Sequence, residues 1–530
     1  MNGLIMDYEL NVPAILRRAE ALFGRKEIVT RLPDKSFHRY TYADFAQRSR
    51  RLASALLGLG LKDGDRVATL CWNHYQHLEV YFGVPISGNV VHTLNLRLSP
   101  GDLAYIANHA GDKALIVDET LLPLYEAFKD QVSFEHVIKV GPEYEELLAS
   151  GDPEWDYPDV DERAAAVMCY TSGTTGMPKG VLYSHRAIAV HSLASTQSGT
   201  LGISERDTVL PVVPMFHANA WGFPFTCTLV GAKQVFPGPH LDPESLLDAF
   251  ERERVTVTGG VPTIWMGILQ LLDAEPKRFD LSSLRSMIVG GSAAPRAMIE
   301  GFEQRHGLHV THAWGMTEMS PLGTVSELTS ALMEAPEDVR FAYRAKQGVP
   351  APFVEIRAVD EEGAFVPWDG KTMGELEVRG AWIASGYYED DSQADRWTED
   401  GWFKTGDIVT IEDGGYIEIQ DRSKDVIKSG GEWVSSVALE NAIMGHPAVA
   451  EAAVIAVPDE KWAERPLAVV VFKEGQSATP DELREHIAPQ FAKWQLPDRF
   501  EVVDEIPKTA VGKFRKTALR EQFAKAAVEA

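Results

Sequence analysis

Cysteine is scarce in this sequence: it has three cysteines among 530 residues, and no two of them form a C-x-x-C pair. Cys71, Cys169 and Cys227 are far apart along the chain, so no disulfide framework is expected. None of them has a plausible general base beside it in the sequence. Free thiols of this kind are typical of a reduced compartment. We therefore predict three buried thiols in a cytoplasmic protein.

Positive charge is also in short supply. The chain has 51 Lys and Arg against 77 Asp and Glu, so its formal net charge is 51 − 77 = −26, and its pI is near 5.0. This balance argues against nucleic-acid binding and against a polybasic membrane anchor. It also repels anionic substrates at long range, so any phosphate-binding site in this protein has to be locally basic.

A long, uniformly apolar run is missing as well. Residues 208–232 contain no Asp, Glu, Lys or Arg and are numerous enough to span a bilayer. However, this segment includes three prolines together with His217 and Asn219, so we interpret it as the buried wall of a pocket and predict no integral membrane segment. The first ten residues, M-N-G-L-I-M-D-Y-E-L, lack the basic and apolar regions of a signal peptide.

The length of the chain requires more than one domain. Alternating patterns, such as a capped helix over 41–59 and a strand over 66–70, predict an α/β fold with doubly wound sheets. Short alternating strands from residue 353 on, with a hairpin at 412–415, predict a small β-barrel that closes this large domain. A smaller α+β domain follows, with a capping box at 479–482. We expect domains at 1–421 and 422–530.

Chemistry-bearing residues follow the ends of several predicted strands. These exits are residues 214–221, 290–295 and 313–321, which carry Gly, His, Trp, Thr or Glu. In open α/β sheets, ligands bind in the crevice beyond the carboxyl ends of the strands. The exits are therefore expected to surround one cleft.

The most informative stretch is 170–180, Y-T-S-G-T-T-G-M-P-K-G, which follows a short apolar run. Glycines let a backbone approach a ligand closely, and hydroxyl and N–H groups donate hydrogen bonds to phosphate oxygens. It is not a Walker A loop, because that pattern places a glycine directly before Lys-Ser/Thr, whereas Pro178 precedes Lys179. The residues indicate a phosphate-binding loop; a polar turn after a strand is the alternative.

This stretch and five further motifs resemble those of the adenylate-forming superfamily, and in particular its acyl-CoA synthetases. The others are F-H-A-N-A-W (216–221), W-G-M-T-E (314–318), K-T-G-D (404–407), D-R-S-K-D-V-I-K-S-G-G-E (421–432) and P-K-T-A-V-G-K (507–513). The six motifs occur in the family's order, and the resemblance covers nearly the whole chain. The resemblance implies an enzyme that uses ATP, Mg²⁺ and CoA to activate a carboxylic acid, with a C-terminal domain that rotates on a hinge.

The resemblance also implies which residues bind the nucleotide. Those of the loops are Thr171, Ser172, Gly173, Thr174, Thr175, Lys179, Gly291, Ala293, Trp314 and Gly315. Asp407 and Arg422 would bind the ribose, since an ionised carboxylate is an acceptor that suits a diol. Trp314 stands where many relatives have a tyrosine beside adenine, and a tryptophan can stack equally well.

The implied catalytic residues are Lys513, His217, Thr317 and Glu318. Glu318 would be the Mg²⁺ ligand and Thr317 a phosphate contact. Lys513 would enter the active site and stabilise the pentavalent phosphorus and the leaving pyrophosphate. Without the family match, Thr317 and Glu318 would indicate a helix start, and Lys513 would belong to a solvated basic face with Lys508, Arg515, Lys516 and Arg520.

The remaining implied roles concern the hinge, the thioester step and the acyl chain. Lys424 would be the hinge, and Lys428, Gly430 and Gly431 would belong to the face that forms the thioester; a flexible linker is the alternative. The acyl site would be lined by His217, Trp221, Gly260, Gly290 and Pro321, with Trp221 lining or gating the acyl tunnel.

The resemblance favours a medium- to long-chain fatty acid as substrate. A short or sulfur-containing aliphatic acid, such as methylthiopropionate, is an alternative. An acyl-AMP ligase that loads a carrier protein is a second, although such relatives carry an insertion ahead of the domain boundary and this chain has none. A non-catalytic nucleotide-binding protein would lose Lys513, Glu318 or Asp407, and all three are present. The sequence does not fix the length of the substrate's acyl chain. A homodimer is one alternative for the oligomeric state.

Overall fold

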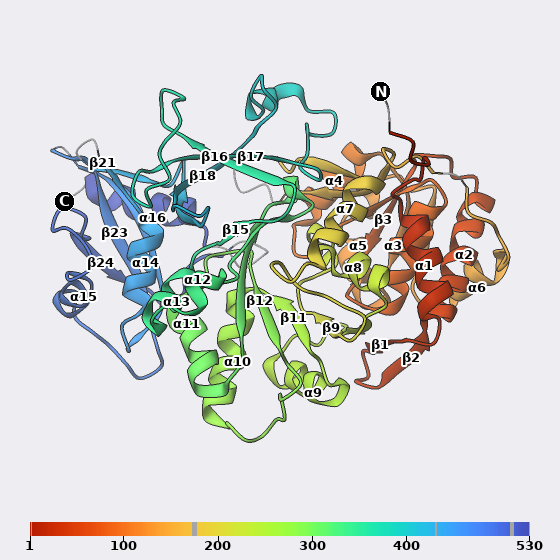
Figure 1. Cartoon of the computed structure of the whole chain (residues 1–530), viewed down its shortest axis with the longest axis horizontal. Helices are drawn as coiled ribbons and strands as arrows, with labels where there is room; N and C mark the ends of the chain where they lie inside the picture. The colour runs from red at the N-terminus through yellow and green to blue at the C-terminus, as the bar shows by residue number, and fades with distance from the viewer. Residues whose placement is uncertain are drawn as a thin grey trace.

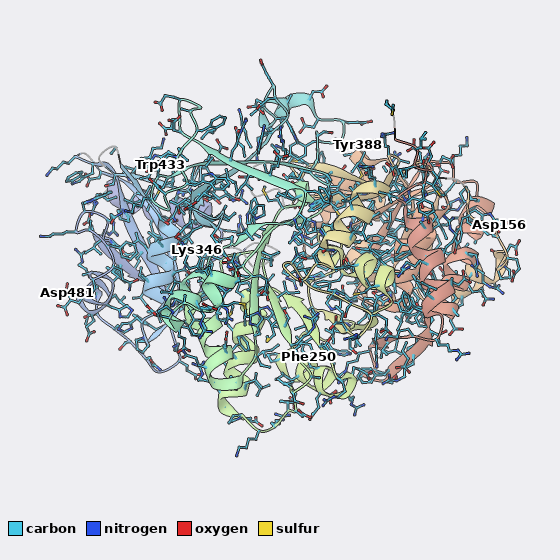
Figure 2. The ribbon with its side chains drawn as sticks, in the orientation of Figure 1. Asp156, Phe250, Lys346, Tyr388, Trp433 and Asp481 are labelled. Carbon is cyan, nitrogen blue, oxygen red and sulfur yellow. The ribbon has the colours of Figure 1, made fainter. Side chains whose placement is uncertain are left out.

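The computed structural model describes residues 1, 3–158, 160–171, 177–429, 432–459, 461–508 and 514–528. Four sheets organise these residues, and helices pack against them (Figure 1). The C-terminal elements lie at one end of the molecule, and the first helices lie at the other. Trp433 and Asp481 mark the C-terminal end, and Asp156 marks the opposite one (Figure 2).

The first large sheet has six strands in the order β6-β5-β3-β4-β7-β8. All its strand pairs are parallel except β7 with β8, which enclose the glycine-rich stretch. The strands are β3 (Arg66–Leu70), β4 (Val90–Thr93), β5 (Asp112–Val117), β6 (His136–Lys139), β7 (Ala165–Tyr170) and β8 (Gly180–Ser184). The helices of this part of the chain are α2 (Tyr42–Gly58), α3 (Tyr75–Ile86), α4 (Pro100–Ala110), α5 (Leu122–Glu126) and α6 (Pro142–Ser150).

The second large sheet has nine strands in the order β15-β14-β13-β12-β11-β9-β10-β1-β2. Its strands are β1 (Glu27–Arg31), β2 (Phe37–Thr41), β9 (Thr208–Pro211), β10 (Lys233–Phe236), β11 (Val257–Gly260), β12 (Ser286–Val289), β13 (Val310–Gly315), β14 (Leu322–Val325) and β15 (Val349–Pro350). The other α-helices before residue 354 are α1 (Val12–Phe23), α7 (His185–Ser195), α8 (Phe223–Val230), α9 (Pro243–Glu253), α10 (Pro262–Ala274), α11 (Arg296–Glu300), α12 (Ser330–Met333) and α13 (Glu337–Ala345). Strands β9 to β13 are parallel, so the predicted loop exits share one edge.

The third sheet corrects the expected barrel. Strands β16 (Val354–Val359), β17 (Gly374–Gly380), β18 (Phe403–Ile411) and β19 (Ile417–Arg422) pair antiparallel in that order, and the predicted hairpin at 412–415 joins the last two. The barrel prediction is wrong: β16 and β19 are the edges of an open sheet and do not pair in the described part of the chain. Alternation reports only that one face is buried, which open and closed sheets share.

The C-terminal domain has a five-stranded sheet and its own apolar core. Its elements are β20 (Ile427–Ser429), β21 (Glu432–Val434), α14 (Ser436–Met444), β22 (Val449–Asp459), β23 (Ala463–Phe472), α15 (Pro480–Ile487), β24 (Arg499–Val502) and α16 (Lys516–Val528). The predicted capping box at the start of α15 is confirmed, because Thr479 accepts from the backbone of Glu482 and the Glu482 carboxylate accepts from Thr479. Capping satisfies backbone groups that a helix start leaves unpaired.

Buried polar groups connect β19 to the C-terminal helices. A carboxylate oxygen of Asp421 accepts hydrogen bonds from the backbone N–H of Ser436 at 3.0 Å and from its hydroxyl at 2.5 Å. Lys516 donates to the Ser436 hydroxyl, and its ammonium lies 2.8 Å from the Glu440 carboxylate. Burial disfavours charge on Lys516, but Glu440 and Asp421 outweigh it and raise the pKa of this lysine. Lys516 is therefore part of the interior rather than of a solvated basic face.

The apolar segment 208–232 forms β9, a short turn and α8, which has eight residues. Among the helices that the structure describes, none combines the length and the apolar character needed to cross a bilayer. The three cysteines are buried and unpaired, as predicted.

Candidate active site

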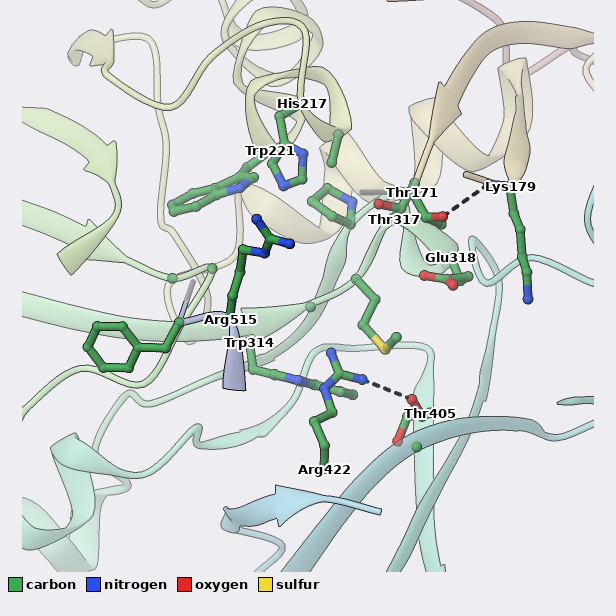
Figure 3. Close-up of a pocket in the computed structure, with 18 of the residues that line it drawn as sticks. Thr171, Lys179, His217, Trp221, Trp314, Thr317, Glu318, Thr405, Arg422 and Arg515 are labelled. Carbon is green, nitrogen blue, oxygen red and sulfur yellow. Dashed lines mark hydrogen bonds between the residues drawn. The ribbon is translucent and has the colours of Figure 1, made fainter. Parts of the chain in front are cut away.

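A cavity of about 900 Å³ lies where both large sheets, the four-stranded sheet and the C-terminal domain meet (Figure 3). Most of the predicted site residues that the structure describes line it: Thr171, Lys179, His217, Trp221, Gly290, Gly291, Trp314, Gly315, Thr317, Glu318, Pro321, Arg422 and Lys424. Residues that are far apart in sequence thus line one cavity, as the strand exits predicted.

Two hydrogen bonds join the described ends of the glycine-rich stretch. Thr171 donates its backbone N–H to the Lys179 carbonyl at 2.9 Å, and the Thr171 hydroxyl accepts from the Lys179 N–H at 3.1 Å (Figure 3). Burial lowers the pKa of the Lys179 ammonium. This ammonium lies 5.0 Å from the ring centroid of Tyr387. The predicted contacts Ser172, Gly173, Thr174 and Thr175 lie outside the described residues.

The W-G-M-T-E motif turns tightly beside this lysine. A Cβ on Gly315 would lie 1.8 Å from the Pro321 carbonyl oxygen, so only glycine permits this close approach. The turn leaves Glu318 5% exposed in the cavity wall, where it accepts a hydrogen bond from the Tyr387 hydroxyl at 2.7 Å. Thr317 precedes it, and its carbonyl accepts from the Tyr183 hydroxyl at 2.6 Å.

Asp407 stands directly behind the cavity wall and is 2% exposed. One of its oxygens lies 2.9 Å from the Arg422 guanidinium, and the other accepts from the Trp314 indole N–H at 3.1 Å. Arg422 also donates to the Thr405 carbonyl at 3.3 Å (Figure 3). The three predicted residues Trp314, Asp407 and Arg422 therefore form one network, with Trp314 and Arg422 lining the cavity.

His217 and Trp221 lie side by side at the opposite end of the cavity (Figure 3). Residues 218–221 have φ values between 42° and 56°, a left-handed conformation that residues other than glycine rarely adopt. This turn brings the indole of Trp221 over the ends of β11 and β12, where a Cβ on Gly290 would come within 3.2 Å of the ring. The same Cβ would lie 2.9 Å from the Ala313 carbonyl oxygen, so Gly290 permits the close approach of both the Ala313 backbone and Trp221.

The C-terminal domain completes the cavity with Lys508, Phe514, Arg515, Lys516 and Thr517. Lys508 and Phe514 form an isolated antiparallel bridge. The side chain of Arg515 points toward Trp221 and His217 (Figure 3). The predicted residues Lys513, Gly430 and Gly431 lie outside the described part of the chain.

Besides Asp407, three described residues of the prediction do not line this cavity. Gly260 is buried against Trp265, where an added Cβ would lie 2.8 Å from the indole, so its small size serves packing in this structure. Ala293 is half-buried beyond Gly291. Lys428 is exposed and its ammonium lies 2.5 Å from the Glu361 carboxylate.

The cavity is locally basic, as a phosphate site in this acidic protein requires. Among the described residues, its wall has eight cationic ones, Arg97, Lys179, Arg396, Arg422, Lys424, Lys508, Arg515 and Lys516, against the three carboxylates of Asp102, Glu318 and Asp425. Sequence reasoning did not select Arg97, Arg396, Arg515 or Tyr387 for this site. Of these four residues, only Arg515 was noted in the sequence, as a member of the basic cluster near the C-terminus.

Comparison with known proteins places these features in a family. The family described as AMP-binding enzyme matches residues 16–388, and its C-terminal domain matches residues 438–513. The long-chain-fatty-acid–CoA ligase of Thermus thermophilus is 53% identical over 529 residues, which covers 98% of this chain and 96% of that protein.

Two further proteins extend this comparison. The 3-methylmercaptopropionyl-CoA ligase of Ruegeria pomeroyi is 45% identical over 537 residues, covering 99% of each chain. Among solved structures, the anthranilate CoA ligase AuaEII in complex with anthranoyl-AMP superposes with a TM-score of 0.89 at 26% identity, covering 100% of both chains. The likeness thus extends over both domains.

Proposed function

Since this chain belongs to the family of AMP-binding enzymes, among its acyl-CoA synthetases, we propose that it joins a medium- to long-chain fatty acid to CoA with ATP. The observation that supports this proposal is the single cavity of about 900 Å³. At one end it has the acidic and basic groups of a nucleotide site, and at the other it has Trp221 beside two glycines.

The first half-reaction forms the acyl-adenylate. A carboxylate oxygen attacks the α-phosphorus of ATP, the bond to the β-phosphate breaks, and pyrophosphate leaves with its electron pair. Lys179 and the residues around it would bind the phosphates, and Asp407 with Arg422 would bind the ribose, near Trp314 and the adenine. Lys513 would stabilise the charge that develops on the phosphate oxygens. His217 would lie beside the reacting carboxylate.

We propose Glu318 as the protein ligand of Mg²⁺. The donor set fits this ion, because Mg²⁺ prefers one or two carboxylates together with substrate phosphates and water. Glu318 supplies a carboxylate in the cavity wall, with the Thr317 backbone and hydroxyl next to it. When bound, the ion neutralises phosphate charge.

The second half-reaction transfers the acyl group to CoA. The thiol sulfur attacks the acyl carbon, and the bond between this carbon and AMP breaks. AMP is a good leaving group, whereas the free acid would have to release hydroxide. We propose that the domain boundary lies between residues 421 and 422 and that the C-terminal domain rotates about Lys424 between the steps. This motion would bring Lys428, Gly430 and Gly431 to the cavity in place of the residues seen there.

Replacing Lys424 with proline is expected to slow thioester formation by about tenfold, or ~1.4 kcal/mol of activation free energy, with a smaller effect on adenylation. Proline fixes φ and restricts the preceding residue, which limits rotation at this position. Each half-reaction can be measured separately, as pyrophosphate release and as acyl transfer from a presynthesised adenylate. Lys424→Ala is the control, because it removes the side chain but leaves the backbone free to rotate. Equal slowing of both half-reactions by proline would count against the hinge.

Two classes of acid are candidate substrates. The Thermus thermophilus relative is named for long-chain fatty acids and the Ruegeria pomeroyi relative for 3-methylmercaptopropionate. A short or sulfur-containing aliphatic acid is therefore the second candidate substrate class. Gly290 and Gly291 line the cavity beside Trp221, where an added Cβ would lie 3.2 Å from Trp221 or from Val261, so these glycines fit closely into the wall and do not set the length of the acid.

AMP formation tests the proposal directly. We expect CoA-dependent AMP release with ATP and Mg²⁺, with a maximum at a middle or long acid in a series from acetate to stearate that also includes 3-methylmercaptopropionate and benzoate. Pyrophosphate release that CoA does not stimulate would indicate a carrier protein as acceptor. No turnover of any acid would contradict the ligase assignment.

We also propose a cytoplasmic location, which the three free, buried cysteines support. A homodimer is one alternative for the oligomeric state, and sedimentation of the purified protein would test it.

A further inference from the structure

We propose that Tyr387 is a positioning residue that holds the Glu318 carboxylate and the Lys179 ammonium in separate places around the triphosphate of ATP. The inference rests on the proposed function, because it takes Glu318 as a Mg²⁺ ligand and Lys179 as a phosphate contact. None of the six motifs of the sequence includes this tyrosine.

The side chain of Tyr387 touches both groups through different parts. Its hydroxyl donates to one Glu318 oxygen at 2.7 Å, and its ring centroid lies 5.0 Å from the Lys179 ammonium. A cation within about 6 Å of an aromatic ring is attracted by the ring face. Glu318 and Lys179 form no direct ion pair in the described part of the chain. Tyr387 therefore satisfies each charged group in part and leaves both accessible to the cavity, whose wall contains all three residues.

The backbone around Tyr387 reaches the same two motifs. Ala384 donates its N–H to the Glu318 carbonyl at 2.8 Å, and Tyr388 donates its N–H to the carbonyl of Gly180 at 2.9 Å. Gly180 directly follows Lys179. Residues 384–388, which we call the brace, thus contact the W-G-M-T-E motif at one end and the glycine-rich stretch at the other.

The brace is itself held firmly. The ring of Trp397 packs edge-on against Tyr387, with centroids 5.2 Å apart, and its indole N–H donates to the Ala384 carbonyl at 2.7 Å. These contacts restrict the Tyr387 ring, so its hydroxyl and its face keep fixed positions. Groups that orient a metal ligand in this way raise its affinity for the metal.

Removing only the hydroxyl separates the two contacts. In Tyr387→Phe the ring stays beside Lys179, but the Glu318 carboxylate loses the hydrogen-bond donor that fixes its orientation. We expect the affinity of the enzyme–ATP complex for Mn²⁺, used as a spectroscopic substitute for Mg²⁺, to fall by about tenfold. ATP binding without metal should be unchanged. In Tyr387→Leu, metal-free ATP binding should weaken as well, by roughly threefold, because the ring face is lost.

Electron paramagnetic resonance of Mn²⁺ and calorimetric titration of ATP in the presence of a chelator measure these affinities without any turnover. Tyr125→Phe, in α5 and outside the cavity wall, is the matched control and should behave as the unaltered protein. A Tyr387→Phe variant with unaltered Mn²⁺ affinity would overturn the inference while leaving the proposed function in place. An unaltered protein that binds ATP with no dependence on metal would overturn both.

Discussion

Replacing Lys513 with alanine is expected to slow pyrophosphate release by at least about 100-fold, or ~2.7 kcal/mol, while the variant still uses a presynthesised acyl-adenylate. A cation delivered to the α-phosphate stabilises charge that exists only during adenylation, so the thioester step should not need it. The segment that contains Lys513 is flanked by Lys508 and Phe514, which both line the cavity and form a bridge with each other. This placement supports the proposed delivery of the lysine.

The measurement uses stopped-flow detection of pyrophosphate with the favoured acid, followed by acyl transfer from the adenylate to CoA. Lys493→Ala, an exposed lysine of the same domain, is the matched control and should not change either rate. If Lys513→Ala released pyrophosphate at the unaltered rate, the catalytic assignment would be wrong. If both half-reactions failed together, the lysine would have a structural role instead.

The second large effect concerns Asp407. Its replacement with alanine is expected to lower kcat/KM for ATP by about 100-fold, because one charge-assisted hydrogen bond to the ribose is worth about 1.5–3 kcal/mol. The change also leaves the Arg422 guanidinium and the Trp314 indole without their shared acceptor. We therefore expect part of the loss to reflect disorder of these two groups.

Nucleotide analogues separate the two causes. The unaltered protein should prefer ATP to 2′,3′-dideoxy-ATP by a large factor, and Asp407→Ala should lose most of this preference. Asp407→Asn keeps an acceptor for Trp314 but loses the charge. Its preference for ATP over 2′,3′-dideoxy-ATP should therefore lie between those of the unaltered protein and of Asp407→Ala. Undiminished discrimination by Asp407→Ala would show that the hydroxyls are bound elsewhere.

Local patterns in the sequence predicted local structure well. The capping boxes that start α2 and α15 and the hairpin between β18 and β19 involve residues within a few positions of each other. Their physical causes are therefore contained in short windows of sequence. The barrel failed for the opposite reason, since closure of a sheet depends on which edges meet, and alternation within a strand says nothing about that.

The candidate site shows the same division. Most of the described residues that were selected from motifs with a glycine, a hydroxyl or a charged pair in a short stretch lie in the cavity wall. Tyr387 could not be found in this way, because its partner Glu318 lies 69 positions earlier. Nor could Lys516 be distinguished from its basic neighbours, since only its contacts with Glu440 and Ser436 show that it is interior.

The hydrogen bonds that cross the proposed domain boundary affect how the protein is distributed between the two domain orientations. Ser436 bonds twice to Asp421, and the Ser435 hydroxyl donates to the Gln420 carbonyl at 2.5 Å. Rotation about Lys424 would break these bonds, which contribute about 0.5–1.5 kcal/mol each. Their sum corresponds to a preference of roughly ten- to a thousandfold for the present orientation. With the proposed rotation, the resting protein should therefore mostly adopt the arrangement of Figure 1, and the binding energy of CoA would have to populate the rotated orientation.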